Sequence, residues 1–256
     1  MAITRRNAVR IVPIKVPDDE LRLATAAAVQ APAGARLTYR GGPVIAAVDV
    51  FAIFWGHAWL TSPQSGLMAS IEDFYRFIVS SAVLRELNEY SAGGTTIATG
   101  TYAGSAVLET SHRRTVSDAT LRKRLKAEIA NNPAFPKPSA NTLFMFHLPS
   151  GVTAVAGKAR SCASFCGYHD AIRKDILYGV LPSPDCTGCL NGMPVLDAIT
   201  VAASHELCEA VTDPIPGQSW YDDANGEIGD ICAWQTKKIG AYTVQLEWSN
   251  KANGCV

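Results

Sequence analysis

The feature that most constrains this chain is a run of histidine and carboxylate residues inside an otherwise apolar segment. Residues 196–212 are rich in Leu, Ile, Val and Ala and are followed by Asp213-Pro214, which predicts a helix that ends there. At about 100° per residue, His205, Glu206 and Glu209 share one side of this helix. Charged groups in such surroundings need a partner or a metal ion.

The spacing His205-Glu206-x-x-Glu209 matches the H-E-x-x-H motif of zinc peptidases with the second histidine replaced by glutamate. An imidazole and a carboxylate one helical turn apart can hold one divalent ion, so His205 and Glu209 are candidate ligands of Zn²⁺. Glu206 can reach a zinc-bound water and is the candidate general base. A catalytic zinc needs a third protein ligand and one open position.

The acidic segment downstream of the helix offers that third ligand. Glu227 follows Asn225-Gly226, a turn pair that can swing the segment back towards the helix, and we expect Glu227 to be the ligand. Asp230 is expected to accept the ring N–H of His205 and is also a candidate ligand. Asp213 and His169 remain alternatives for the third position.

The cysteines are confined to the last third of the chain and allow two interpretations. The seven are Cys162, Cys166, Cys186, Cys189, Cys208, Cys232 and Cys255. Six of them can form three disulfides in an oxidising compartment, with one thiol left over. Alternatively, the first four can hold a structural zinc, because their spacing is near that of a zinc ribbon. The spacing alone leaves both open.

The rest of the chain alternates strand and helix signals and predicts an α+β fold. Residues 1–42 have weak periodicity and are expected to form an arm or lead-in, and residues 43–256 a single domain. Among the other histidines, His147 is expected to be a core side chain, His57 a strand-end residue and His112 part of a solvated loop. The predicted strands are residues 43–55, 142–148, 175–181 and 242–248, with an edge strand at the end of 91–106, and the predicted helices are 70–90 and a segment from the N-cap Ser117 to Pro133.

Composition excludes several function classes. The 23 Lys+Arg and 23 Asp+Glu give a net charge of zero, so the basic excess of a nucleic-acid binder is missing. No run approaches the roughly 20 apolar residues of a membrane span. An acidic stretch at residues 18–20 stands where a signal peptide would have its apolar run, so no export signal is visible and a cytoplasmic location stays possible.

Several segments together resemble the plant Exordium, or phosphate-induced-protein, family and its bacterial and fungal relatives. The resemblance covers roughly residues 43–256 and is strongest in the second half. It rests on the run from Asp197 through His-Glu-Leu-Cys-Glu to Pro214, on Trp220-Tyr221, on Glu227-Ile-Gly-Asp-Ile-Cys232, on Cys162-Ala-Ser-Phe-Cys166-Gly-Tyr-His169, on the Cys186/Cys189 pair and on Trp248 to Cys255.

The resemblance implies a zincin-like fold, with a mixed twisted sheet, a metal-binding active-site helix and a cysteine-stapled C-terminal part. Plant members carry Asn-Pro in place of Asp213-Pro214, which makes Asp213 a poor candidate for an obligatory ligand. They also have a small residue in place of Cys208, which marks Cys208 as the odd thiol. The family is typically secreted, which favours disulfides, including one between Cys232 and Cys255, and an extracytoplasmic location.

The sequence therefore predicts a zinc-dependent hydrolase, most simply a metallopeptidase acting on a peptide or protein substrate. Tyr168, His169 and Tyr221 are candidate partners for the oxyanion. One alternative is a non-catalytic secreted binding or signalling protein that keeps the metal for structure. Another is a mononuclear metalloenzyme of other chemistry, such as an iron enzyme. Cleavage specificity and oligomeric state are left open.

Overall fold

A mixed five-stranded sheet forms the centre of the molecule. The computed structural model describes residues 32, 34–109 and 114–256, and the order of the strands is β3-β2-β5-β9-β8. Four strands are parallel, and the edge strand β8 is antiparallel to β9. The strands are β2 (Ala47–Trp55), β3 (Ala98–Leu108), β5 (Thr142–His147), β8 (Tyr168–Ile172) and β9 (Ile176–Leu181). The expected α+β architecture with a mixed sheet is confirmed.

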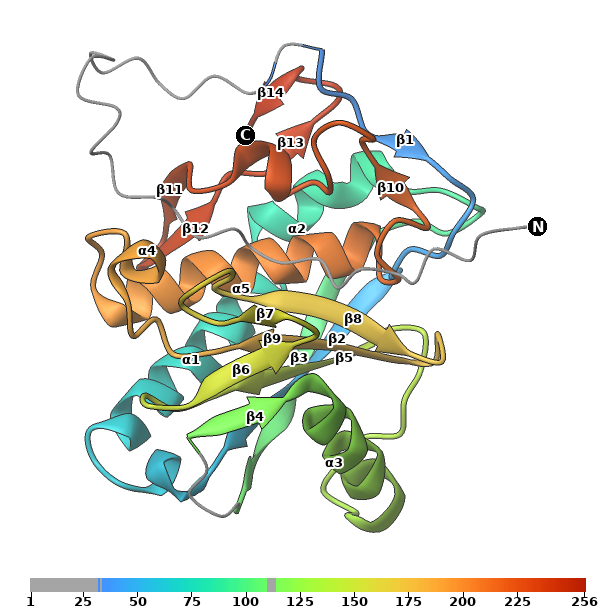
Figure 1. The fold of residues 1–256 in the computed structure, drawn as a ribbon. Coiled ribbons are helices and arrows are strands. Elements are labelled where there is room, and N and C mark those ends of the chain that lie inside the picture. Colours follow the sequence, from blue (N-terminus) through green and yellow to red (C-terminus); the bar gives the residue numbers. More distant parts are fainter. Residues whose placement is uncertain (1–31, 33, 110–113) are drawn as a thin grey trace.

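Each face of this sheet is covered by its own apolar core. Along β2, Val50 and Phe54 belong to one core while Phe51 and Ile53 belong to the other, as the two-residue repeat of a strand requires. Figure 1 shows α5 lying along the first face, and α3 lies on the second. The helices are α1 (Gln64–Ile78) and α5 (Val195–Thr212) on the first face and α3 (Asp118–Asn131) on the second.

The C-terminal third forms short ribbons on the side of α5 that faces away from the sheet (Figure 1). Hydrogen bonds join β12 to α5, because the Thr200 hydroxyl donates to the Thr243 carbonyl at 2.7 Å and Gln245 N–H donates to the Ser204 hydroxyl at 3.0 Å. The ribbons pair β1 (Thr38–Tyr39) with β10 (Trp220–Tyr221), β11 (Thr236–Ile239) with β12 (Tyr242–Gln245), and β13 (Trp248–Ser249) with β14 (Gly254–Cys255). α5 is thus enclosed on both sides.

Smaller elements complete the fold. A second sheet on the α3 side consists of β4 (Thr115–Ser117), β6 (Thr153–Ala156) and β7 (Ala159–Arg160), and the remaining elements are the 3₁₀ turns His57–Leu60, Leu87–Tyr90 and Asp230–Cys232 and the helices α2 (Ala82–Glu86) and α4 (Thr187–Leu190). Among the described residues, no helix has the length and apolar character needed to cross a membrane.

Several predicted boundaries need correction. The single helix expected at residues 70–90 begins earlier and is broken at Ser81, whose hydroxyl accepts the N–H of Val83 and starts α2. The terminal strand expected at 242–248 is split into β12, which pairs with β11, and β13, which pairs with β14. Ser117 caps α3 as predicted, with its hydroxyl accepting the N–H of Thr120.

The cysteines form three disulfides, and Cys208 is a buried free thiol. The pairs are Cys162–Cys186, Cys166–Cys189 and Cys232–Cys255. The disulfide interpretation is therefore confirmed, and the zinc-ribbon alternative is wrong because its four sulfur atoms bond to one another in pairs.

The lead-in is described only in part. Of residues 1–42, the structure describes 32 and 34–42, and there Ala35 and Leu37 are buried. His112 lies outside the described residues. His147 is a buried core side chain, as predicted, and bonds the Tyr75 hydroxyl through Nε2 at 3.0 Å.

Candidate metal centre

The predicted motif helix is the most deeply buried helix of the fold. α5 is buried continuously from Ala198 to Thr212, and it starts directly after Pro194, whose fixed φ suits the edge of a helix. A helix between a sheet and a layer of ribbons is apolar on every side. His205, Glu206 and Glu209 are nonetheless at most 1% exposed. These three ionisable side chains must therefore be satisfied inside the protein.

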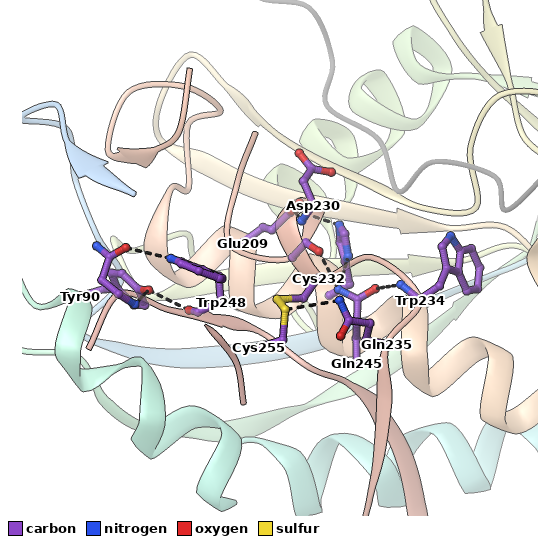
Figure 2. Close-up of a disulfide and its surroundings, with 12 residues drawn as sticks. Tyr90, Glu209, Asp230, Cys232, Trp234, Gln235, Gln245, Trp248 and Cys255 are labelled. Atoms are coloured by element: carbon purple, nitrogen blue, oxygen red, sulfur yellow. Dashed lines mark hydrogen bonds and ion pairs between the residues drawn. A yellow bond between two sulfur atoms is a disulfide. The ribbon is translucent and has the colours of Figure 1, made fainter. Parts of the chain in front are cut away.

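His205, Glu209 and Asp230 form the first cluster. His205 Nε2 lies 2.9 Å from Glu209 Oε1, and one potential ligand atom from each of the three side chains falls within 4.8 Å of the others. Asp230 is brought close by its own backbone, because its N–H donates to Glu209 Oε1 at 3.2 Å. Glu209 and Asp230 lie together beside the Cys232–Cys255 disulfide (Figure 2), which fixes the loop that carries Asp230.

His169 from β8 joins a second cluster to the first. Its Nδ1 lies 3.1 Å from Glu206 Oε2 and 3.5 Å from Glu209 Oε2. Its Nε2 lies 3.5 Å from Glu227 Oε1 and 3.2 Å from the Asp213 carbonyl oxygen. Glu209 therefore directs one oxygen to each histidine, and His169 stands between the two glutamates Glu206 and Glu227.

Glu227 and Asp230 belong to different parts of the site. Glu227 is fully buried beside His169, and its N–H donates to Asp230 Oδ2 at 3.1 Å. Asp230, expected to receive the ring N–H of His205, is instead the carboxylate grouped with His205 and Glu209. The structure thus brings both acidic residues to the centre, with Asp230 nearer to the motif histidine.

Gln245 contacts Nδ1 of His205 and was not among the candidates predicted from the sequence. Its Oε1 accepts the N–H of Trp234 at 3.1 Å, and its Nε2 donates to the Gly229 carbonyl at 2.9 Å (Figure 2). The same Nε2 lies 2.8 Å from His205 Nδ1. These bonds fix the amide orientation, so the amide nitrogen of Gln245 faces His205 Nδ1.

Two glycines let the backbone approach the site closely. A Cβ on Gly167 would lie 2.9 Å from Glu206 Oε1, and one on Gly229 would lie 2.7 Å from His205 Nδ1. Any side chain at either position would displace the functional groups. In the sequence, Gly167 and Gly229 lie in the segments Cys166-Gly-Tyr and Ile-Gly-Asp230, which both belong to the runs that resemble the Exordium family.

The carboxylate of Asp213 and the hydroxyl of Tyr168 are engaged outside this cluster. Both carboxylate oxygens of Asp213 are used by backbone N–H groups of the loop that follows it, at 2.6 to 3.1 Å. Tyr168 points to the opposite face of the sheet, where its hydroxyl bonds Asp118 at 3.1 Å. Tyr221 lies in β10 under the guanidinium of Arg40, whose carbon is 4.2 Å from the ring centroid.

The buried charges shift one another strongly. Burial disfavours the charged imidazolium, yet the neighbouring carboxylates raise the pKa of both His169 and His205 well above the ordinary value. Burial also opposes ionisation of Glu209, but His205 and His169 lower its pKa to about 2. Burial raises the pKa of Glu206, and burial together with the charge of Glu209 raises that of Asp230 to about 7. Protons on the histidines, on Glu206 and on Asp230 therefore offset the negative charge of the carboxylates, a role that a bound cation could also fill.

The donor atoms fit a divalent metal ion. Within the described residues, Glu206 Oε1 and both carboxylate oxygens of Glu227 are buried without a hydrogen-bond partner. His205 Nε2 is also without one, since its short approach to Glu209 lacks hydrogen-bond geometry. Imidazole nitrogen and carboxylate oxygen are common zinc ligands.

Comparison of the chain with protein-family models, with curated proteins and with solved structures gave no match.

Proposed function

We propose that this protein is a zinc-dependent hydrolase with a zincin-like fold, and specifically a metallopeptidase. The observation that carries the proposal is the group of buried His205 and Glu209 with half-buried Asp230, with Glu206 next to His205 on the same helix. These three side chains would hold the ion. Glu227, on the far side of His169, is the other candidate ligand.

Zinc bound at these residues would act as a Lewis acid towards the scissile carbonyl and would lower the pKa of a coordinated water. Glu206 would accept the proton of the attacking water and pass it to the leaving amine. Its raised pKa suits this exchange. Glu206 is placed for it because it adjoins His205 but is not one of the three ligands.

His169 would position Glu206 and stabilise negative charge. Its Nδ1 contacts Glu206 Oε2, and Glu227 and Glu209 keep the ring positively charged. A positive group fixed at this point would favour the oxyanion of a tetrahedral intermediate. In this proposal His169 takes the role for which Tyr168 and Tyr221 are also sequence candidates.

The sheet favours an extended peptide as substrate. β8 carries His169 and is an edge strand that pairs with β9 alone among the described strands. An extended chain can add to such an edge through main-chain hydrogen bonds, and this would place a peptide bond next to His169. The three disulfides support a secreted or extracytoplasmic protein.

The test is cleavage of an unbiased peptide library by the protein stripped with a chelator and then resupplied with zinc. The proposal predicts cleavage with zinc, none after stripping and none by Glu206→Gln loaded with zinc. Stoichiometric metal without any cleavage would favour a structural metal. Activity that returns only with iron would favour the other metalloenzyme chemistry.

A further inference from the structure

A cavity lies at the N-terminal half of α5, on the helix that carries the proposed centre. It has a volume of about 320 Å³ and lies between α5, α1 and the ends of β5 and β9. Its walls are mainly apolar, and Trp59, Leu67, Leu181, Val195 and Ile199 contribute to them. This volume is near the lower end, about 300 Å³, of the range for ligand sites, and it suits one large side chain.

Leu181 is shared between this cavity and the surroundings of Glu206. A Cβ on Gly167 would lie 2.9 Å from Glu206 Oε1 and 3.1 Å from Leu181 Cδ2, so the carboxylate and the leucine flank the same glycine. Ile199 precedes Glu206 by seven residues, which places it two turns, or about 10 Å, along the same side of α5. Glu206 and the cavity are therefore both next to Leu181.

The base of the cavity is polar but uncharged. His147 lines it and bonds the Tyr75 hydroxyl through Nε2 at 3.0 Å, and burial lowers the pKa of His147 to about 3. Asp185 lies at the edge, where its two oxygens accept the Gly151 N–H and the Ser183 hydroxyl. Asp185 at the edge is therefore the one charged group among the described lining residues, and the walls themselves are apolar.

One wall of the cavity is an exposed apolar residue. Val195 is 43% exposed and is one of three large apolar side chains that the described residues leave exposed, with Tyr39 and Leu60. Burying Val195 against an apolar group would be favourable. This exposure gives the cavity a mouth that a ligand side chain can cover.

We propose that this cavity receives a large apolar side chain, of leucine, methionine or phenylalanine size, from the residue next to the scissile bond. The inference rests on the proposed peptidase function and names its substrate class. It predicts that one of the two residues flanking the cleaved bond is selected for size and lack of charge.

The first arm of the test is cleavage of peptides that carry Ala, Leu, Phe or Lys at each flanking position. We expect Leu and Phe to exceed Ala at one position by about tenfold or more in kcat/KM. Val195→Trp, which fills the mouth, should abolish that preference. Leu60→Trp, an equally exposed site outside the cavity lining, should keep it. Equal rates for all four residues, or a preference unchanged in Val195→Trp, would overturn the inference.

The second arm measures binding without turnover. N-acetyl-phenylalaninamide and N-acetyl-alaninamide are titrated into Glu206→Gln protein while the NMR signals of the Leu67, Leu181 and Ile199 methyl groups are followed. Saturable shifts with the phenylalanine probe alone are expected, and they should be lost in the Glu206→Gln/Val195→Trp protein. Binding without any peptide cleavage would refute the proposed function and keep the cavity, whereas cleavage without binding would refute the cavity's role alone.

Discussion

The two halves of α5 carry different kinds of side chain into the interior of the protein. From Val195 to Ala203 the helix presents mainly apolar side chains, and two of them, Val195 and Ile199, line the cavity. From Ser204 to Thr212 it buries His205, Glu206 and Glu209 with several atoms unpartnered. Apolar side chains such as those of the first half are what packing in a protein interior favours. The second carries groups that packing alone does not explain, and this contrast marks the site.

The difference also concerns what each half contributes to stability. Apolar burial in the first half stabilises the fold by about 25 cal/mol per Å². The carboxylates of the second half are desolvated, and their histidine partners must hold protons to offset them. A bound cation would take over that role, so metal binding should stabilise the protein.

The largest expected effect separates chemistry from metal binding in the second half. Glu206→Gln should lower kcat for peptide cleavage by about 100- to 10,000-fold, because the amide cannot accept a proton. Its zinc content should stay at one equivalent, since Glu206 is not proposed as a ligand. Peptide cleavage and metal analysis on the same preparation measure both. Loss of zinc in this variant would show that Glu206 is a ligand and would overturn the assignment.

Next is the disulfide that precedes β8. Replacing Cys166 and Cys189 by serine should lower the free energy of unfolding by about 3 kcal/mol, as for a closed loop of this size, and should weaken zinc binding. The second effect arises because Cys166 adjoins Gly167, which packs on Glu206. Denaturant unfolding and zinc titration report the two quantities.

The matched control is replacement of Cys162 and Cys186 by serine. Their disulfide closes a loop of nearly equal length, and Cys162 is four residues further from Gly167 in the sequence than Cys166 is. It should cost similar stability with a smaller loss of zinc affinity. Equal losses of affinity in both variants would mean that the Cys166–Cys189 disulfide has no special link to the site.

The next effect is a pH dependence of stability that arises from one buried carboxyl group, Glu247. Glu247 is buried with both oxygens unpartnered among the described residues, and burial raises its pKa well above the ordinary value. The folded state therefore binds more protons than the unfolded state, so Glu247 makes stability fall as pH rises above about 4.3. Glu247→Gln should remove this contribution and so make stability depend less on pH between pH 5 and pH 7.

Thermal or denaturant unfolding across this pH range is the measurement. Glu86→Gln is the control, since Glu86 is an exposed carboxylate paired with Lys237 at 3.1 Å, and its removal should leave the slope unchanged. An unchanged slope in Glu247→Gln would mean that Glu247 ionises in the folded protein at its ordinary pKa.

The smallest predicted effect concerns the partner of His205. Gln245→Glu replaces a donor by an acceptor, which favours a proton on Nδ1 and leaves Nε2 free for a metal. We expect zinc to bind about tenfold tighter, equivalent to about 1.4 kcal/mol. Gln235→Glu is the control, because Gln235 bonds Cys255 instead of the histidine. Weaker binding in Gln245→Glu than in Gln235→Glu would contradict the role given to Gln245.

The sequence predicted the parts of the molecule that depend on local pattern. The motif helix was expected at 196–212 and is found at Val195–Thr212, and the strand expected at 142–148 is found at Thr142–His147. Both have an uninterrupted apolar pattern and clear end signals. Ser81 was missed as a helix break because its capping bond depends on a single hydroxyl.

What could not be predicted depends on contacts between distant segments. β8 has five residues, two of them His169 and Asp170, and its pattern is too short and polar to indicate a strand. The meeting of His169 with Glu206 follows only from its pairing with β9. Likewise, Gln245 reaches His205 across 40 residues because β12 lies on α5. The site residues on α5 can therefore be recognised within one segment of sequence. His169 and Gln245 come from distant segments and join the site only through the tertiary fold.

Metal stoichiometry tests the central claim most directly. The purified wild-type protein is equilibrated with zinc, freed of excess and analysed for metal per chain, beside His205→Ala, Glu209→Ala and the control His147→Ala, a buried histidine outside the cluster. Folding of each variant is confirmed by circular dichroism. We predict one zinc in the wild type and in His147→Ala, and less than a tenth in the other two. A full equivalent of zinc in either His205→Ala or Glu209→Ala would contradict the proposed centre.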